Sequence, residues 1–527
     1  MFTQMTNPPP LTPAFRITFG ILVALTLSLI WVPHYLPLTD YPEHLLAIQV
    51  LGHYHDTAFE FARNYTYDLH NLPYISVYLL GMGLVRIFSV YTVGKIILSL
   101  YVVLTPASIL MLVRSIPGLS PWNAIVSIGL LFNLFYYLGS LNFLLSIFLA
   151  FFLLALLLQA TQGLAETPAR PRDAQNKISR PWISSAILCL LSIALLYSHI
   201  VTFVAVLFVA VVLLGHALAR RRPIRYAIVS LLPSIVLTAY LLWHQRSAAP
   251  SSYEMSWLPF RDRLFDLLQP FLIYRDDVFH HIVINRLYLI LLGIWVLTVA
   301  VSMLLSIHGP IRDNNISGRS AATTRSIGWI ILGCFTLTAI IFPSQIPSAS
   351  VGHRLSVLVM FSICAVIPGT IFQKQTWRAV LIAVTGLVLA LNGYYAYEFN
   401  QEMRPFMELV QHMKPDARVL PLFANLHCAH LKTYPFLHVI NYYHLEKGGT
   451  NPYLLFQNMP QMPVHYRALD ELPAVGSFDP RGFNWEKHHD SYQYFLTRDP
   501  APQILEQLQD HTREVFHSDG WDLFEPR

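Results

Sequence analysis

Long apolar runs alternate with short polar segments over the first three quarters of the chain. Each run is about as long as the 20 or so residues that an α-helix needs to cross the hydrocarbon core of a membrane. This pattern predicts a polytopic helical membrane protein with about eleven spans, near 17–35, 92–113, 122–138, 141–160, 182–198, 201–219, 226–243, 286–306, 328–342, 354–372 and 379–397.

The segment Leu72–Phe88 is a twelfth apolar run of less regular character, since it contains Arg86 and follows a polar stretch. The four most basic short loops decide its interpretation, because basic loops stay on the cytoplasmic side. With eleven spans all four loops lie inside and residues 37–91 lie outside. We therefore expect Leu72–Phe88 to be an interfacial or re-entrant helix on the outer face. A true crossing, with two other runs merged, is the alternative.

The pattern changes after residue 397. From Glu398 to Arg527 the chain is polar, and it contains no run of membrane length. Met403–Met413 has the spacing of an amphipathic helix, and Ala417–Phe423 and Ser491–Thr497 have the pattern of strands. The sequence thus predicts a transmembrane domain over 1–397, with an outer catalytic loop at 37–91, and a small extracytoplasmic α/β domain over 398–527.

Composition agrees with this division. The chain is 54% hydrophobic and 12% charged, whereas soluble domains average about 25% charged residues. The net charge of +5 is spread over the loops, which argues for membrane topology and against nucleic-acid binding. The first apolar run has one basic residue before it, Arg16, and no small-residue cleavage site after it, so we interpret it as a retained span.

The most informative polar cluster is Thr39-Asp40-Tyr41-Pro42-Glu43-His44, just after the first span. Ionisable groups near the membrane core are costly, so their presence there indicates a functional site. A carboxylate at this place can take a proton from a hydroxyl group or orient a metal ion. A solvated loop with turn-forming Asp and Pro is the alternative. Asp40 is the predicted catalytic residue, and Glu43 and His44 are expected to tune or relay its proton.

Other polar groups are predicted on the same outer side. Arginine matches the oxygens of a phosphate or pyrophosphate headgroup bidentately, and histidine can accompany it. Tyrosine and tryptophan suit the faces of sugars. The candidate donor-binding residues are His353 and Arg354 at the start of a span, Asn142 and His199 at hairpins between spans, and Arg246 in a long outer loop. For Asn142 a turn role, for His199 a helix cap, and for His353 and Arg354 interfacial anchoring are the alternatives. Together the clusters suggest transfer of a sugar from a lipid phosphate carrier.

The chain resembles the GT-C superfamily of polytopic glycosyltransferases, especially the bacterial protein mannosyltransferase and aminoarabinose transferase relatives. The resemblance lies in the first span, the acid-bearing segment Thr39–His44, a membrane-surface helix at Leu72–Phe88, many spans and a C-terminal outer domain. It implies an inverting transferase in which Asp40 is the catalytic base and Arg354 with His353 contacts the donor phosphate.

The same resemblance implies a polyprenyl-phosphate-linked sugar as donor and a glycan, lipid or protein as acceptor, at the outer face of the bacterial inner membrane. Relatives often carry two adjacent acids in the first loop. Here Asp40 and Glu43 are three residues apart, which leaves a divalent metal as an open alternative. Ser140 and Asn142 stand where many relatives have a second acid.

Two other functions remain open from the sequence: a transporter or flippase for a lipid-linked glycan, and a non-catalytic assembly factor. A transporter is expected to have inverted repeats and polar or broken helices at mid-membrane. The spans here are almost entirely apolar, and the polar groups collect at one surface. This distribution favours an enzyme that works at the interface.

Overall fold

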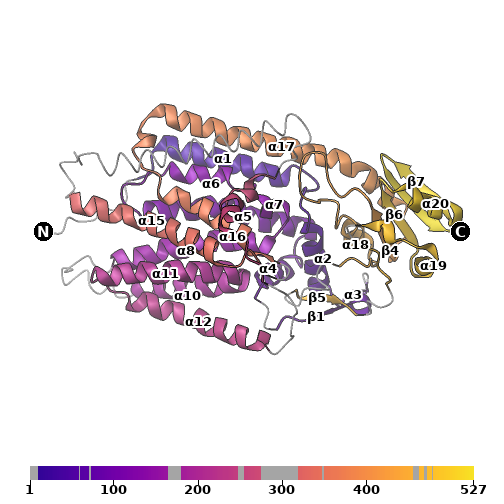
Figure 1. The fold of residues 1–527 in the computed structure, drawn as a ribbon, viewed down its shortest axis with the longest axis horizontal. Coiled ribbons are helices and arrows are strands. Elements are labelled where there is room, and N and C mark those ends of the chain that lie inside the picture. Colours follow the sequence, from indigo (N-terminus) through magenta and orange to yellow (C-terminus); the bar gives the residue numbers. More distant parts are fainter. Residues whose placement is uncertain are drawn as a thin grey trace.

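The computed structural model describes residues 10–57, 60–70, 73–163, 180–246, 255–273, 318–346, 349–454, 462–467, 472–476 and 479–527. In this part of the chain the long helices run side by side along the longest dimension of the molecule, and a mixed sheet of the C-terminal segment lies at one end (Figure 1). The structure is therefore a helical bundle with a small α/β unit beyond it.

Among the described residues, six helices are long and apolar enough to cross a membrane, and the chain is a membrane protein. They are α1 (Pro13–Trp31), α5 (Val90–Arg114), α8 (Leu141–Gly163), α11 (Ile200–Ala219), α12 (Arg225–Arg246) and α17 (Gln375–Gln411). Three further helices have shorter apolar stretches: α10 (Arg180–Ser198), α15 (Gly318–Ile341) and α16 (Val351–Ser362). The sequence predicted a helix at each of these places.

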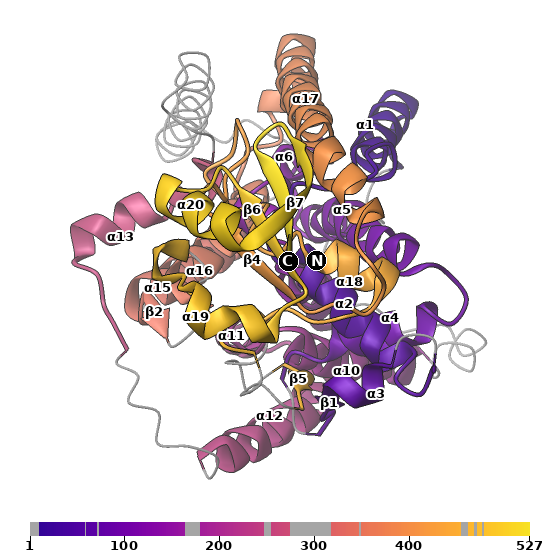
Figure 2. The ribbon, with the colours of Figure 1, turned by 90° about the vertical axis from the view of Figure 1, so that its right-hand side faces the viewer.

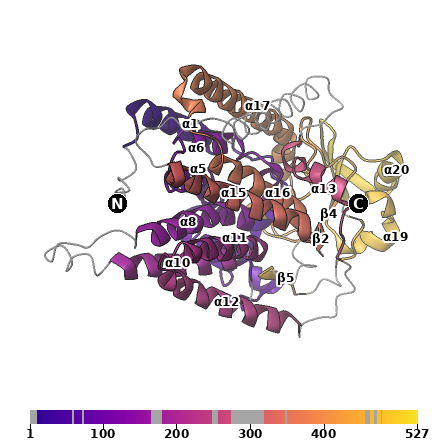
Figure 3. The ribbon, with the colours of Figure 1, turned by 60° about the vertical axis from the view of Figure 1, so that its left-hand side comes forward.

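The helices form three groups that follow one another across the bundle (Figure 3). Helices α1 and α17 lie together on one side, α5, α15 and α16 lie in the middle, and α8, α10, α11 and α12 lie on the other side. Helix α8 packs against α5, α10 and α11, and its apolar residues are mostly buried, so it forms the centre of the bundle. A helix that is apolar all round is expected at such a place.

Two of the predicted spans differ from the structure. Residues 122–138 form two short helices, α6 (Asn123–Gly129) and α7 (Leu134–Tyr137), instead of one span. Asn133 is extended between them, accepts a hydrogen bond from the backbone N–H of Phe135 at 3.0 Å and donates one to the Leu130 carbonyl at 3.0 Å. An asparagine that satisfies backbone groups in this way competes with helix continuation.

The predicted span at 354–372 also breaks early. Helix α16 ends at Ser362, and 3-10 turns follow at Ile363–Ala365 and Ile371–Gln373. The predicted span 286–306 lies outside the described residues. Of the ten predicted spans that lie within the described residues, those at 122–138 and 354–372 are therefore not single continuous helices.

The segment directly after the first span contains a helix that the sequence did not predict. Residues Tyr41–Gly52 form helix α2, and almost every side chain in it is buried. The rest of the outer segment contains α3 (Phe61–Asn64), β1 (Tyr65–Tyr67) and α4 (Ser76–Leu84). Helix α4 has nine residues, which at about 1.5 Å each is far too short to cross a membrane. The structure thus contains a helix in the Leu72–Phe88 region that is too short to be a span.

Helix α17 continues through the predicted boundary at residue 397. It has 37 residues, and at a rise of about 1.5 Å per residue it is roughly twice as long as a membrane core requires. Its second half carries the amphipathic Met403–Met413 segment, whose Phe406 packs on Trp521 with ring centroids 5.2 Å apart. The predicted last span and the predicted amphipathic helix are therefore one rod that joins the bundle to the C-terminal sheet (Figure 1).

The C-terminal sheet has four strands in the order β4-β6-β8-β7. Strands β4 and β6 are parallel, and the other neighbours are antiparallel. The predictions of strands at Ala417–Phe423 and Ser491–Thr497 are confirmed as β4 and β6. The elements of this unit are β4 (Val419–Phe423), α18 (Asn441–Lys447), α19 (Trp485–His488), β6 (Tyr494–Arg498), α20 (Pro502–His511), β7 (Thr512–Ser518) and β8 (Trp521–Pro526).

The segment between α1 and α5 and the C-terminal unit are in direct contact. Strand β1 pairs with β5 (Val464–Tyr466) in antiparallel fashion, with Tyr65 opposite Tyr466. Helix α18 packs on α2, and Figure 2 shows both of them beneath the sheet when the molecule is viewed from its C-terminal end. Elsewhere the short strands β2 (Gln345–Ile346) and β3 (Ala349–Ser350) form a hairpin next to α13 (Phe260–Asp266).

Gly139 fixes the turn between α7 and α8 against the start of α2. It has φ +73°, and a Cβ atom placed there would lie 2.8 Å from the backbone nitrogen of Tyr41. Only glycine accepts this backbone conformation and this close approach without strain.

Gly139→Ala is expected to lower the free energy of unfolding by about 1–3 kcal/mol, the usual cost of a strained backbone conformation. The matched control is Gly129→Ala in α6, where a Cβ atom meets nothing within 4 Å and alanine favours the helix. Thermal unfolding of the purified proteins in detergent tests both. Equal unfolding temperatures for the two variants would contradict the role given to Gly139.

Candidate active site

Asp40 lies at the amino-terminal end of α2, and backbone hydrogen bonds fix its position. Its N–H donates to the Leu138 carbonyl at 2.9 Å, and the N–H of Thr39 donates to the Tyr137 carbonyl at 2.9 Å. Pro42 lies in the first turn of α2, where its missing N–H costs nothing. The α7–α8 turn and the helix start therefore fix the position of Asp40, and the amino end of α2 favours a negative charge there.

Glu43 is one turn into α2 and is fully buried, with 0% of its side chain exposed. Its Oε1 lies 3.0 Å from Nδ1 of His438, a residue just before α18 in the C-terminal unit. A buried carboxylate is tolerated only with a partner of this kind. Burial by itself lowers the pKa of His438, but the charge of Glu43, its hydrogen bond and the charge of Asp40 together raise it above its ordinary value.

His438 also faces Asp40. Its Nε2 lies 3.8 Å from Oδ1 of Asp40 and has no hydrogen-bond partner among the described residues. Asp40 keeps 24% of its side chain exposed, so of the two carboxylates it is the one that a substrate can reach. His438 therefore joins the inner acid, Glu43, to the outer one.

The pKa of Asp40 is higher than that of an ordinary carboxyl group. Burial raises its pKa from 3.8 to about 6, and the charge of Glu43 acts in the same direction, whereas the charges of His438 and Arg354 oppose it. A carboxylate with a pKa near 6 is mostly ionised at neutral pH and is still basic enough to accept a proton. Perturbed carboxylates of this kind occur preferentially at functional sites.

His44 points to a different neighbour. Its Nδ1 lies 2.8 Å from the hydroxyl of Tyr78 in α4, and that hydroxyl donates to the sulfur of Met462 at 3.1 Å. Burial, helped by the charge of His438, lowers the pKa of His44 to about 3. The imidazole is therefore neutral, and in this geometry it connects α2 to α4. The expected role of His44 as a proton relay for Asp40 stays a prediction.

Arg354 lies in the first turn of α16 with its guanidinium over the ring of Phe135, 5.0 Å from the centroid. Its Nη1 donates to the Ser350 carbonyl at 3.2 Å, while its Nε has no hydrogen-bond partner among the described residues. Its charge acts on Asp40. The structure thus brings Arg354 into the electrostatic surroundings of Asp40, with one buried donor group that has no partner among the described residues.

His353, its neighbour in sequence, is occupied elsewhere. Its Nδ1 lies 2.8 Å from the hydroxyl of Ser350, and its Nε2 lies 3.2 Å from Oδ1 of Asp266 in α13. The first contact is local to the β3–α16 junction, and the second reaches α13. The predicted pair therefore separates: the surroundings of Asp40 include Arg354, while His353 is bound to α13.

The remaining candidates have structural partners. The side-chain Oδ1 of Asn142 accepts a hydrogen bond from the backbone N–H of Val77 at 3.2 Å, which fixes the start of α4. His199 caps α11, because its Nδ1 accepts from the N–H of Thr202 at 3.3 Å. Arg246 was expected in a loop, but it is the last residue of α12, and its side chain lies outside the described part of the structure. The cap interpretation of His199 therefore has direct support, whereas Asn142 is the second residue of α8 and joins that helix to the start of α4.

Sequence reasoning missed His438 and Tyr78. The tyrosine-rich stretch around His438 has the composition of a domain core, and the histidine shows no local partner pattern that would connect it with Glu43. The described residues contain no group of three or more His, Cys, Asp and Glu side chains arranged to hold a metal ion. A divalent metal at Asp40 and Glu43 therefore stays an open alternative.

Removal of one member of the Glu43–His438 pair leaves the other buried without its charge partner. Glu43→Ala and His438→Ala are each expected to lower the free energy of unfolding by about 3–5 kcal/mol. The double variant should cost less than the sum by about 0.5–3 kcal/mol, since the two residues interact directly. Unfolding in denaturant measures all three. Arg481→Ala, which breaks an exposed pair with Asp479, is the control with near-normal unfolding, and strictly additive losses for Glu43 and His438 would refute the pairing.

Comparison with known proteins adds the following. No protein-family model matches the chain, and no curated protein matches it significantly. Among solved structures, the chain is similar to the crystal structure of ArnT from Cupriavidus metallidurans in the apo state. The two align over 97% of this chain and 98% of that one, with a TM-score of 0.49 and 12% sequence identity.

Proposed function

We propose that the protein is a membrane glycosyltransferase that moves a sugar from a polyprenyl-phosphate donor to an acceptor of the cell envelope at the outer face of the membrane. The observation that carries the proposal is Asp40, which follows the membrane helix α1. Its carboxylate is partly exposed, so a substrate can reach it, and it has a pKa of about 6. The resemblance of the segment Thr39–His44 to the first acidic segment of GT-C enzymes supports the same assignment.

In the proposed reaction Asp40 accepts the proton of an acceptor hydroxyl while the hydroxyl oxygen attacks the anomeric carbon of the donor sugar. The bond from that carbon to the phosphate oxygen breaks, and its electron pair leaves with the polyprenyl phosphate. A single displacement of this kind inverts the anomeric configuration. The proton ends on Asp40, and the charge that develops ends on the phosphate.

Arg354 is the proposed partner of that phosphate. It is near enough for its charge to act on Asp40, and its Nε has no hydrogen-bond partner among the described residues. A guanidinium group that is already positioned by the rings of Phe135 and Phe143 can stabilise the leaving phosphate without reorganisation. Glu43 and His438 are positioning residues, since they act on the reaction through Asp40.

Asp40→Asn is expected to lower sugar transfer by at least about 10²-fold, because the amide cannot accept the proton. Folding should be retained, since burial disfavours the charge that the substitution removes. Transfer from a polyprenyl-phosphate sugar in proteoliposomes, with thermal unfolding measured alongside, tests the prediction. The matched control is Asp68→Asn, an exposed acid of the same outer segment.

The pH dependence supplies a second readout for Asp40. Because the folded-state pKa is raised to about 6, the carboxyl group is protonated and inactive below that pH. The wild-type rate should therefore rise with pH through about 6 and level off above it. A folded Asp40→Asn protein with near-normal turnover would overturn the assignment. Movement of the lipid-linked sugar across the membrane without its transfer to an acceptor would overturn it as well.

Arg354→Gln is expected to weaken binding of the polyprenyl-phosphate donor by about ten-fold or more, which is the usual loss for a hydrogen bond to a charged group. Arg378→Gln is the matched control, because that guanidinium also lies over an aromatic ring, Trp122, at 5.1 Å. Direct donor binding to the purified variants distinguishes them. Equal affinities would return Arg354 to an anchoring role.

A further inference from the structure

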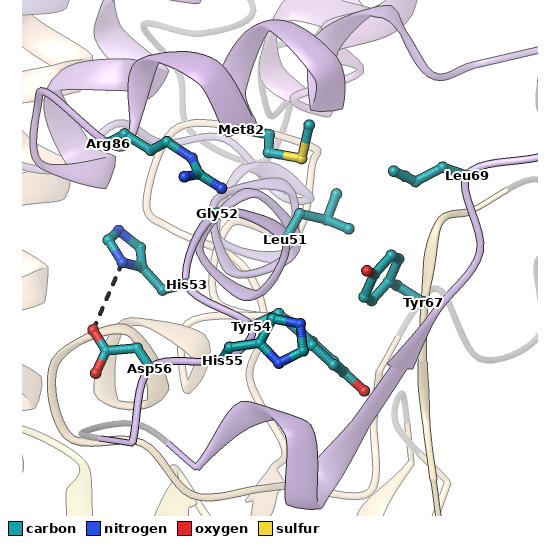
Figure 4. A pocket seen from close by; sticks show the side chains of 10 residues that line it. All are labelled: Leu51, Gly52, His53, Tyr54, His55, Asp56, Tyr67, Leu69, Met82 and Arg86. Carbon is teal, nitrogen blue, oxygen red and sulfur yellow. Dashed lines mark ion pairs between the residues drawn. The ribbon is translucent and has the colours of Figure 1, made fainter.

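A cavity lies at the opposite end of α2 from Asp40. It has a volume of about 400 Å³ and is formed by the carboxyl end of α2, the residues that follow it, β1 and the end of α4 (Figure 4). Because α2 has 12 residues, its two ends are separated by about 18 Å along the helix axis. The cavity is therefore separate from the surroundings of Asp40.

The walls of the cavity differ in chemistry from side to side. Figure 4 shows Arg86 and His53 on one side and Tyr67 and Leu69 on the other, with Leu51 between them. The ring of Tyr67 packs edge-on against Tyr54, with centroids 4.7 Å apart. The cavity thus combines a cation, an imidazole, aromatic rings and an apolar floor, which suits a headgroup that is polar on one side only.

Arg86 is the charged group of the lining that has no counter-ion among the described residues. Its side chain is exposed, and it makes no hydrogen bond or ion pair with any described residue. The carboxylate of the lining, Asp56, lies beside His53, with Oδ2 and Nδ1 3.8 Å apart (Figure 4). The carboxyl end of α2 adds about half a negative charge. A ligand that complements Arg86 is therefore an anion.

The position of Arg86 indicates where that anion comes from. Helix α5, one of the candidate membrane spans, begins at Val90, so Arg86 lies one turn before the chain enters the membrane. The intervening Ile87 and Phe88 are 75% and 42% exposed. Apolar side chains next to a cation, at the end of a span, suit contact with acyl chains below a charged headgroup.

We propose that this cavity binds the phosphate-bearing headgroup of an anionic membrane lipid. The phosphate lies on the Arg86 guanidinium, which matches its oxygens bidentately. The rest of the headgroup occupies the space between His53 and Tyr67, and the acyl chains leave over Ile87 and Phe88. The site is independent of sugar transfer at Asp40, and it anchors the outer segment to the membrane surface at the far end of α2.

Native mass spectrometry of the full-length protein from nanodiscs with equal parts of phosphatidylglycerol and phosphatidylcholine tests the proposal. The wild-type protein should retain phosphatidylglycerol preferentially. Arg86→Gln should lower its affinity about ten-fold or more, the usual loss for a hydrogen bond to a charged group. Arg63→Gln, an exposed arginine of the same segment that is paired with Glu60, is the matched control and should bind like the wild type.

Two further measurements separate a lipid from a soluble phosphate. Phe88→Ser should weaken binding of phosphatidylglycerol although it leaves Arg86 in place, and inorganic phosphate at the same concentration should not displace the lipid. Retention of phosphatidylglycerol by Arg86→Gln at the wild-type level would overturn the proposal. Displacement of phosphatidylglycerol by inorganic phosphate would overturn the conclusion that the bound anion belongs to a lipid. Thermal unfolding confirms that each variant is folded, and activity at Asp40 is not needed for any of these readouts.

Discussion

The burial of Glu43 is the constraint on which the arrangement of the outer half of the molecule depends. A carboxylate with no exposed surface must have a partner, because isolation of its charge costs far more than one side chain can contribute to stability. The partner is His438, 3.0 Å away, and it belongs to a distant part of the chain. The first outer segment and the C-terminal unit must therefore fold together.

Other contacts join the same two parts of the chain. Strand β1 pairs with β5, and α17 holds the segment before Asp40, since the side chain of Asn400 exchanges two hydrogen bonds with the backbone of Tyr35 at 2.8 and 3.0 Å. Arg498 of β6 adds an ion pair to Glu402 of α17 at 3.3 Å. The long helix α17 thus connects the bundle to the sheet, and α2 lies between them (Figure 1).

This enclosure explains the chemistry that we assign to Asp40. The acid is at the end of a buried helix, so its charge is disfavoured by burial and by Glu43, and it is partly rescued by His438 and Arg354. Opposing effects of this kind give a carboxylate that is ionised at neutral pH and still basic. The same helix has its other end at the anionic-lipid cavity, so one buried element separates a site for chemistry from a site for membrane contact.

Much of the bundle follows from the sequence alone. Apolar runs at 17–35, 92–113, 141–160 and 201–219 predicted α1, α5, α8 and α11, because a span must be apolar over nearly its whole length whatever its neighbours are. The acids after the first span identified Asp40 as a candidate for a similarly local reason: charge beside a membrane is costly. The short strands β4 and β6 were also predicted, the second of them from the alternation of Tyr492, Tyr494 and Leu496.

What the sequence could not determine depends on contacts between distant segments. The pattern Thr39–His44 is equally compatible with a solvated loop and with the start of a buried helix, and only the packing of α18 over α2 decides for the helix. The break at Asn133 depends on which backbone groups its side chain can reach. His438 carries no local sign of its role, because a histidine becomes a partner for Glu43 only when the fold brings the two together. The sequence by itself thus determined the membrane helices and the acid at their surface, while the tertiary structure decided which residues surround that acid.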